Sequence, residues 1–342
     1  MNKTAVVILN WNGRDLLRRY LPSVIANSTA DGGVDVIVAD NASSDDSLDV
    51  LASDFPSVGI IKLDRNYGFA EGYNRTLALL PHDYVVLLNS DVATPDGWLQ
   101  PLVHLLDTDP TVGACGPKIL DDKNHALFEY AGAAGGFIDV LGYPFCRGRI
   151  MDTVETDDGQ YDDTTNCLWV SGAALMVRRK LYLETGGLDA DFFAHMEEID
   201  FCWRIRNLGW RVVAVCDGPR VFHLGGATLA QGNPRKTYLN FRNNLTMMVK
   251  NYNGHAWWLV LLARMTLDGV AALRFLLSAQ GRQFAAIFKA HVHFWRRLPS
   301  SLNKRKALKP TRRADLVPEV KPYSMIWRYY ARHLKTFNTI DK

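Results

Sequence analysis

Four short apolar runs alternate with segments of helical spacing over the first ninety residues of the chain. The expected strands cover residues 5–9, 34–39, 58–63 and 84–88, and the expected helices between them cover residues 16–25, 47–52 and 69–80. Runs this short and this apolar are typical of strands that are buried on both faces. The alternation predicts a parallel, doubly wound α/β sheet, in which ligands bind at the carboxyl ends of the strands.

Polar side chains follow three of these apolar runs. Asn10 follows the first run, Asp40 follows the second, and Asn89, Ser90 and Asp91 follow the fourth. A carboxylate at the end of a buried strand is costly unless something offsets its desolvation, and a divalent metal bound to a diphosphate would do so. Asp91 could hold Mg²⁺ or Mn²⁺ together with phosphate oxygens and a nitrogen ligand. An ordinary strand-to-turn acid is the alternative.

Asp40 and the segment 65–74 are candidates for contact with a nucleotide. The Asp40 carboxylate could accept the N3–H group of uracil or thymine, or a ribose hydroxyl. Alternatively, it belongs with residues 43–45 to the N-cap of the next helix. Gly68 and Gly72 would let the backbone approach a flat ring or a phosphate closely, although ordinary helix–sheet packing uses the same spacing.

A run of acids opens a predicted helix over residues 192–208. Glu197 and Glu198 fall near its start, where the helix dipole favours negative charge. One of them could project into a cleft as a general base, and the alternative is a charged helix terminus without a catalytic part. Asp200 and Arg204 are four residues apart, which allows an ion pair on the helix.

His223 precedes two glycines, an arrangement that suits a metal ligand on a tight loop. A single histidine is more often structural, so both interpretations stay open. A further helix is predicted over residues 238–252, from which Tyr238, Arg242 and Asn243 could reach a diphosphate.

The remaining segments complete an expected α/β domain over residues 1–253. Residues 97–107 are predicted as a helix, residues 167–178 as a strand with a turn, and residues 210–215 as another strand. Residues 121–166 are irregular, and we expect a lid, an acceptor-side loop or a β-ribbon there.

Residues 254–342 differ in character from the domain before them. Residues 257–277 are strongly apolar but carry Arg264, Asp268 and Arg274, whereas a spanning helix needs about 20 apolar residues with almost no charge. We expect helices that lie in the membrane interface, or alternatively a helical bundle packed on the α/β domain.

Charge is distributed unevenly along the chain. Residues 289–342 carry 14 Lys/Arg and 3 Asp/Glu, a formal charge of +11, although the whole chain carries only +3. Such a basic end favours an anionic partner, and the aromatic residues interleaved with it suit lipid headgroups at least as well as nucleic acid. We therefore expect an anionic membrane surface and no nucleic acid as the partner.

The five cysteines, odd in number and without a C-x-x-C pair, indicate reduced thiols and neither zinc nor a disulfide framework.

Seven segments, taken in order, resemble the family 2 glycosyltransferases, and in particular the subgroup that contains rhamnosyltransferases of cell-envelope polysaccharides. The resemblance extends over residues 3–250. The segments are Val-Val-Ile-Leu-Asn-Trp-Asn-Gly (6–13), Val-Ala-Asp-Asn-Ala-Ser-Ser-Asp (38–45), Arg-Asn-Tyr-Gly-Phe-Ala-Glu-Gly-Tyr-Asn (65–74), Leu-Leu-Asn-Ser-Asp (87–91), Ser-Gly-Ala (171–173), Glu-Glu-Ile-Asp-Phe-Cys-Trp-Arg (197–204) and His-Leu-Gly-Gly (223–226).

The resemblance implies a GT-A fold and assigns roles to the matching positions. Asp40 would hold the pyrimidine base. Asp91 would stand for the metal-binding acid of the family's Asp-x-Asp motif, and His223 would complete a site for Mg²⁺ or Mn²⁺. The other residues expected to bind the nucleotide sugar are Asn10, Asn12, Asn66, Gly68, Asn74, Asn89, Ser90 and Arg242.

Two positions depart from the family pattern. Glu198 falls where the family has the second residue of a Glu-Asp pair, its catalytic base, so the base would be one methylene longer here and Glu197 stays possible. Asn89 replaces the first acid of Asp-x-Asp, which leaves one fewer negative charge for the metal.

The resemblance implies an inverting, metal-dependent glycosyltransferase. The donor would be dTDP-rhamnose or a UDP-sugar, and the acceptor would be a hydroxyl of a cell-envelope glycan or a lipid-linked sugar, at the cytoplasmic face of the membrane. The enzyme would be peripheral or monotopic.

One alternative is a catalytically silent sugar-nucleotide binding or scaffold protein. A Rossmann-type dehydrogenase or a nucleotidyltransferase is disfavoured, because Asn-Trp-Asn-Gly follows the first strand in place of G-x-G-x-x-G.

Overall fold

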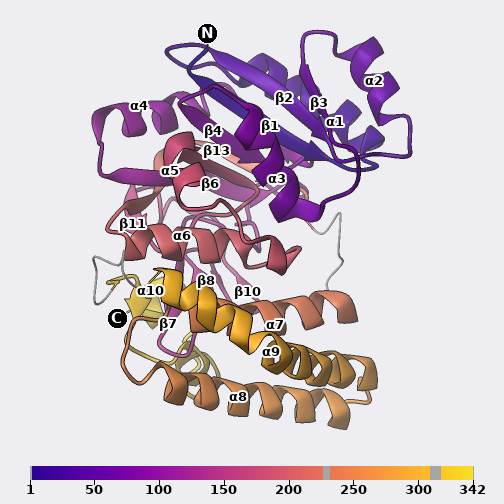
Figure 1. Ribbon diagram of the computed structural model, residues 1–342. Helices are drawn as coiled ribbons and strands as arrows, with labels where there is room; N and C mark the ends of the chain where they lie inside the picture. Colours follow the sequence, from indigo (N-terminus) through magenta and orange to yellow (C-terminus); the bar gives the residue numbers. More distant parts are fainter. Residues whose placement is uncertain (1, 226–231, 309–316, 342) are drawn as a thin grey trace.

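The computed structural model describes residues 2–225, 232–308 and 317–341, and a nine-stranded sheet organises its N-terminal part (Figure 1). Eight strands follow the order β11-β13-β6-β12-β4-β1-β2-β3, and β5 pairs with β13. The strands are β1 (Thr4–Asn10), β2 (Val34–Asp40), β3 (Gly59–Lys62), β4 (Tyr84–Leu88), β5 (Val92–Ala93), β6 (Val112–Asp121), β11 (Thr165–Cys167), β12 (Ala174–Arg178) and β13 (Arg211–His223).

The four strands predicted in the first ninety residues form the parallel part of this sheet. β1 lies between β2 and β4, and β3 lies beside β2, all in parallel. β12 then enters antiparallel to both β4 and β6, and β11 is antiparallel to β13. The sheet is therefore mixed, and not mostly parallel as predicted. The segment 167–178, predicted as one strand with a turn, divides into the end of β11 and a separate β12.

Helices cover both faces of the sheet, as the doubly wound prediction requires. Successive strand residues point to opposite faces, so β1 contributes Val6 and Ile8 to one core and Ala5 and Val7 to the other. The first core also takes residues from α1 (Arg14–Asn27), α2 (Ser47–Asp54) and α4 (Gln100–Thr108), and the second from α3 (Gly68–Leu79), α5 (Arg179–Glu184) and α6 (Glu197–Asn207).

Two elements differ from their predicted bounds. α6 begins at Glu197 and not at residue 192, because Phe193, His195 and Met196 all adopt left-handed backbone angles that no α-helix accommodates. A single 3₁₀ turn, η1 (Ala190–Phe192), precedes them. β13 is longer than the predicted 210–215. Its register against β6 shifts at the polar residues in the middle of the strand, and beyond that shift β13 continues and pairs with the end of β6.

The irregular region after β6 contains a small second sheet, which identifies it as a β-ribbon. Its order is β10-β9-β8-β7-β14, and β14 is supplied from near the end of the chain. The strands are β7 (Gly136–Asp139), β8 (Pro144–Cys146), β9 (Arg149–Ile150), β10 (Thr153–Val154) and β14 (Val320–Lys321).

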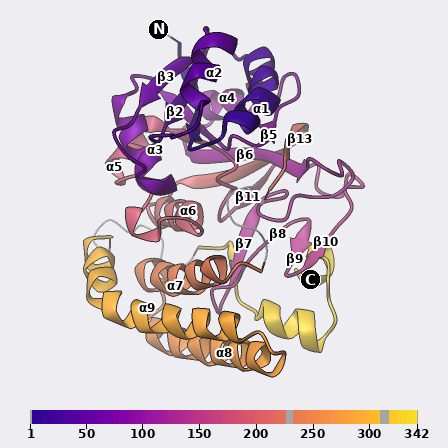
Figure 2. The same cartoon turned by 90° about the vertical axis from the view of Figure 1, so that its right-hand side faces the viewer.

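Three long helices follow the sheet. They are α7 (Pro234–Asn251), α8 (Trp257–Leu277) and α9 (Gly281–Leu308). In both views α7 lies nearest the sheet, α9 packs on α7, and α8 forms the outer side of the molecule (Figures 1 and 2). After α9, a π-helical turn η3 (Trp327–Ala331) and the short α10 (Phe337–Ile340) bring the chain back to the β-ribbon. The proposed division of the chain at residue 253 stays a prediction.

Two of the three charges that interrupt the apolar sequence of α8 face inward, and the third, Arg274, is exposed. Arg264 and Asp268 are buried and form an ion pair at 2.8 Å, and the Arg264 guanidinium also lies 3.7 Å from the centre of the Tyr143 ring. The apolar residues of α8 consequently include many that face solvent. None of the helices within the described ranges is both long enough and apolar enough to span a bilayer.

Candidate active site

Asn10 and Asp40 lie side by side at the carboxyl ends of β1 and β2, where the sheet register pairs them. Both are buried, and the Asn10 amide donates to Asp40 Oδ2 at 3.1 Å. The other Asp40 oxygen accepts the backbone N–H of Ser43 at 2.9 Å. Asp40 therefore shapes the loop after β2, whereas Asp46 occupies the N-cap position of α2. Asn10 Oδ1 is buried without a hydrogen-bond partner, so it is available to a ligand.

The loop after β1 is bonded to the loop after β2. The Asn12 N–H donates to Ser43 Oγ at 2.9 Å, and Asn12 Oδ1 accepts the Ser44 N–H at 2.7 Å. Asn12 has a φ of 52°, and the Trp11 side chain beside it is 54% exposed. The two loops therefore hold a large aromatic ring open to solvent next to Asn10.

Asn41 joins these loops to the turn that begins α3. Its Oδ1 accepts the Tyr67 N–H at 2.9 Å, and its amide donates to Asn66 Oδ1 and to the Gly68 carbonyl, both at 3.1 Å. Gly68 has a φ of +75°, and a Cβ there would lie 3.1 Å from the Phe193 ring, so glycine is required. Asn41 was not among the predicted site residues, although it directly follows Asp40 at the same strand end.

A second group lies across the sheet, where β4 and β13 end. His223 Nε2 is 3.2 Å from Asp91 Oδ1 and 3.3 Å from the amide nitrogen of Asn89. On the other side of the ring, His223 Nδ1 is 3.4 Å from Glu129 Oε1. Ser90 lies between Asn89 and Asp91 at this strand end. Glu129 was not among the site residues predicted from the sequence. It belongs to the irregular region after β6, and only the fold brings it close to His223.

The electrostatics of this group favour a cation. Asp91, Glu129 and His223 are all buried. Burial alone would lower the pKa of the His223 imidazole, but the two carboxylates outweigh it and raise that pKa to about 10. The Asp91 carboxylate is a suitable ligand for Mg²⁺ or Mn²⁺, whereas the His223 imidazole could join it only after giving up the proton that the two carboxylates favour. Within residues 2–225, 232–308 and 317–341, no group of three or more acid, histidine or cysteine side chains is arranged to hold a metal by itself.

Glu197 and Glu198 open α6 with oxygen atoms that have no partners. The Oε2 atoms of both side chains are shielded from solvent and make no hydrogen bond, and the same holds for His195 Nε2 just before them. Burial raises the pKa of Glu198 to about 7, although backbone N–H groups at the helix start oppose the shift. Burial and the neighbouring Glu198 raise the pKa of Glu197 further, well above its ordinary value. Both shifts favour the protonated carboxyl, and ionising both neighbouring acids together is unfavourable.

The segment before β12 connects Glu198 with the strand end of Asn89. The Asn89 N–H donates to the carbonyl of Ala173 at 3.0 Å. A Cβ on the adjacent Gly172 would lie 3.5 Å from the Cβ of Glu198. Glu198 and the strand end that carries Asn89 therefore border the same Ser-Gly-Ala segment.

Two predicted binding residues have their side chains engaged elsewhere. Asn74 Oδ1 accepts the Leu188 N–H at 2.9 Å and the Tyr182 hydroxyl at 2.7 Å, and its amide donates to the Leu188 carbonyl at 2.7 Å. Arg242 donates to the carbonyls of Asp191 and Phe192. The structure does not bring these two side chains together with the Asp40 and Asp91 groups. Gly226 of the His-Leu-Gly-Gly segment lies outside the described residues.

Known proteins resemble this chain in both sequence and structure. An N-acetylglucosaminyl-diphospho-decaprenol L-rhamnosyltransferase of Mycobacterium tuberculosis is 27% identical over 285 residues, which cover 79% of this chain and 90% of that protein. Staphylococcus aureus TarS 1–349 in complex with UDP superposes with a TM-score of 0.57 at 15% identity, over 97% of this chain and 92% of that one. GalNAc-T7 with UDP, GalNAc and Mn²⁺ superposes with a TM-score of 0.56 at 16% identity, over 73% of this chain and 48% of that one.

The sequence model described as "Glycosyl transferase family 2" matches residues 5–182, just over half of the chain. This match includes Asp40 and Asp91, whereas Glu198 and His223 lie beyond it. The structural neighbours are GT-A glycosyltransferases, which confirms the predicted fold. The chain therefore belongs to glycosyltransferase family 2 and is a GT-A glycosyltransferase that resembles the rhamnosyltransferases of that family.

Proposed function

We propose that this enzyme transfers a sugar, with inversion, from a pyrimidine nucleotide-diphosphate sugar to a hydroxyl of a cell-envelope glycan or lipid-linked acceptor. The observation that carries the proposal is that two groups lie at strand ends of the sheet, while Glu198, at the start of α6, packs against the Ser-Gly-Ala segment beside one of them. The Asn10–Asp40 pair can accept hydrogen bonds from a base, the Asp91–His223 pair favours a cation, and Glu198 has an unpartnered oxygen and a raised pKa.

Glu198 is the residue that moves a proton in this proposal. Its carboxylate takes the proton of an acceptor hydroxyl, whose oxygen then attacks the anomeric carbon from the face opposite the diphosphate. The neighbouring Glu197 stays protonated, because a second charge in the same buried place is unfavourable. Asp91 and His223 would hold the divalent metal, which when bound neutralises the charge that develops on the leaving diphosphate.

Our first choice of donor is dTDP-L-rhamnose, with a UDP-sugar as the alternative. The mycobacterial relative is named as an L-rhamnosyltransferase that acts on a decaprenyl diphosphate-linked N-acetylglucosamine. The UDP in the TarS structure supports a pyrimidine base, the group that Asp40 is proposed to hold. With a lipid-linked acceptor in mind, we propose the cytoplasmic face of the cell membrane as the location of the reaction.

The outer surface of α8 and α9 supports contact with that membrane. We define this surface by its large exposed apolar side chains, namely Trp258, Leu259, Leu262, Val270, Leu273, Leu276, Leu277, Phe288 and Trp295. Asp268 is the one acid in the sequence of these two helices, and it is buried, whereas Arg274, Arg282 and Lys289 are exposed. An apolar surface with basic and no acidic neighbours suits the headgroup region of an anionic bilayer.

A donor panel tests the transfer reaction. Purified protein is incubated with dTDP-rhamnose and UDP-sugars, with and without Mn²⁺ and a prenyl diphosphate-linked N-acetylglucosamine, and nucleotide release is measured. We expect release that requires both metal and acceptor. Binding of a nucleotide sugar without any release would instead support the silent binding protein, and release that is independent of metal would refute the metal-dependent mechanism.

Vesicle pelleting tests the membrane surface. We expect the protein to pellet with vesicles of phosphatidylglycerol, more weakly with phosphatidylcholine, and less at high salt. The double variant Leu273→Glu, Leu277→Glu changes two side chains that are 53% and 80% exposed and should abolish pelleting. The matched control is Leu79→Glu in α3, whose leucine is 68% exposed. Equal pelleting of all three proteins would refute the assignment of this surface.

A further inference from the structure

The loop that leads into α6 is held in an unfavourable backbone conformation. Phe193, His195 and Met196 have φ values of 67°, 68° and 73°. Residues other than glycine persist in this region only where surrounding contacts over-determine them. The contacts that hold residues 189–196 therefore decide where the following Glu198 lies.

Asn243 of α7 supplies the densest of these contacts. Its amide donates to the carbonyls of Phe192, Ala194 and His195, at 3.1, 2.9 and 2.8 Å. Its Oδ1 accepts from the Arg242 guanidinium at 2.8 and 2.6 Å, which fixes the orientation of the amide. Asn243 is 1% exposed, so water does not compete for these bonds.

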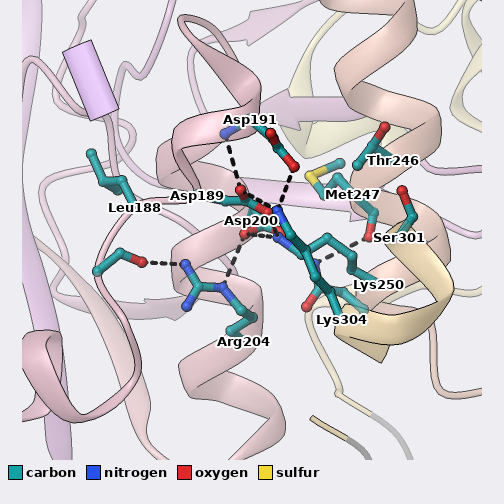
Figure 3. Close-up of polar contacts among 12 residues, drawn as sticks. Leu188, Asp189, Asp191, Asp200, Arg204, Thr246, Met247, Lys250, Ser301 and Lys304 are labelled. Carbon is teal, nitrogen blue, oxygen red and sulfur yellow. Dashed lines mark hydrogen bonds and ion pairs between the residues drawn. The ribbon is translucent and has the colours of Figure 1, made fainter. Parts of the chain in front are cut away.

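Ion pairs, buried at Lys250 and partly exposed at Lys304, fix the two ends of the same loop to α7 and α9, as Figure 3 shows. Lys250 Nζ lies 2.6 Å from Asp189 Oδ2 and 2.7 Å from Asp200 Oδ2, and so joins the start of the loop to the first turns of α6. Lys304 of α9 bonds Asp189 at 2.6 Å and Asp191 at 2.7 Å. The loop is therefore anchored before and after the segment that Asn243 holds.

The other side of the loop contacts the nucleotide end of the site. The carbonyl of Phe193 accepts the Phe69 N–H at 3.3 Å, next to Gly68. One loop thus connects the turn expected to bind the donor, the proposed base and α7.

We propose that Asn243 is a positioning residue, which places the Glu198 carboxylate by holding the three carbonyls of the preceding loop. The role of Glu198 as base rests on the proposed function, whereas the effect of Asn243 on the loop does not. Asn243 was expected from the sequence to reach a diphosphate, and its amide is instead committed to the loop. Catalysis is sensitive to such placement, since an error of about 1 Å can cost about 10²-fold in rate.

Asn244 provides the matched control. It is also 1% exposed and lies next along α7, but its amide donates to the Gly142 carbonyl at 2.7 Å, in the β-ribbon region. Replacing each asparagine by alanine removes one buried amide from the same helix. Only Asn243→Ala removes the bonds to the catalytic loop.

Hydrogen exchange by mass spectrometry, with the full chain and without substrate, gives the first readout. We expect exchange in peptides that cover residues 189–200 to become about ten-fold faster in Asn243→Ala and to stay unchanged in Asn244→Ala. Asn243→Asp keeps the shape and loses the donors, so it should behave like Asn243→Ala. Unchanged exchange in Asn243→Ala, or equal acceleration in Asn244→Ala, would overturn the proposal.

Kinetics on the donor that the panel identifies give the second readout. We expect Asn243→Ala to lower kcat by about 10²-fold while KM for the donor stays near the wild-type value, and Asn244→Ala to change neither. A rise in KM alone would overturn a positioning role in favour of donor binding. If the wild-type protein turns over no donor, the proposed function fails, and the exchange measurement still decides whether Asn243 holds the loop.

Discussion

Replacing Glu198 by glutamine tests the assignment of the base most directly. The substitution keeps the size of the side chain and removes its ability to accept a proton. Loss of a general base lowers the rate by about 10²- to 10⁴-fold, so we expect a loss of that size in kcat. The wild-type enzyme should gain activity as the pH rises through about 7, because its base acts only as a carboxylate and burial raises the pKa of Glu198 to about 7.

The same pKa predicts an effect on stability. In the unfolded chain Glu198 ionises near its ordinary value of 4.5, whereas the fold raises this pKa to about 7. The native state therefore binds more protons between these two values, and the wild-type free energy of unfolding falls as the pH rises across this interval. At 1.36 kcal/mol per pKa unit, the penalty above pH 7 is at most about 3 kcal/mol. The glutamine variant escapes this penalty.

Urea unfolding and steady-state kinetics from pH 5 to 8.5 check both effects. We expect Glu198→Gln to be less active than the wild type and more stable at pH 8, with the stability difference shrinking toward pH 5. Glu197→Gln is the control for activity only: it should leave the pH profile of kcat in place, whereas its effect on stability should have the same sign as that of Glu198→Gln, because burial and Glu198 also raise the pKa of Glu197. Full activity of Glu198→Gln, or a stability difference that does not change with pH, would refute the reasoning.

Three further substitutions address the rest of the site. Asp40→Asn should weaken binding of UDP by about ten-fold or more, measured by calorimetry, because a charged acceptor for the base is lost; unchanged affinity would remove Asp40 from the nucleotide site. Glu129→Gln should weaken binding of Mn²⁺ in the presence of UDP by about 10- to 100-fold, followed by electron paramagnetic resonance, because the carboxylate orients the His223 ring. Equal Mn²⁺ affinity would make Glu129 a bystander. Gly68→Ala should cost about 1–2 kcal/mol in urea unfolding, because its φ is +75° and its Cβ would press on Phe193.

The sequence predicted the parallel half of the sheet and its polar edge well. Strand length and apolar character report burial directly, and the residue after a buried strand is forced to the same edge as its neighbours. Asn10, Asp40 and Asp91 could therefore be placed at strand ends without any knowledge of distant contacts.

Long-range contacts explain what could not be predicted. The spacing around residues 192–196 is compatible with a helix, and the contacts that hold that segment in another conformation, among them three bonds from Asn243, come from residues far away in the sequence. Glu129 has no local signal either, since it reaches His223 through the path of the β-ribbon.

The return of the chain to the β-ribbon constrains how this enzyme can be shortened. β14 pairs in parallel with β7, and the Met325 N–H donates at 2.8 Å to Asp139, a fully buried carboxylate. A truncation after residue 253 would remove the apolar helices but also this strand, and would leave Asp139 Oδ2 without the Met325 N–H, while Oδ1 keeps the N–H groups of Leu141 and Tyr143. A version without the proposed membrane surface is better obtained by replacing the exposed leucines of α8, so that both ends of the helical segment stay attached.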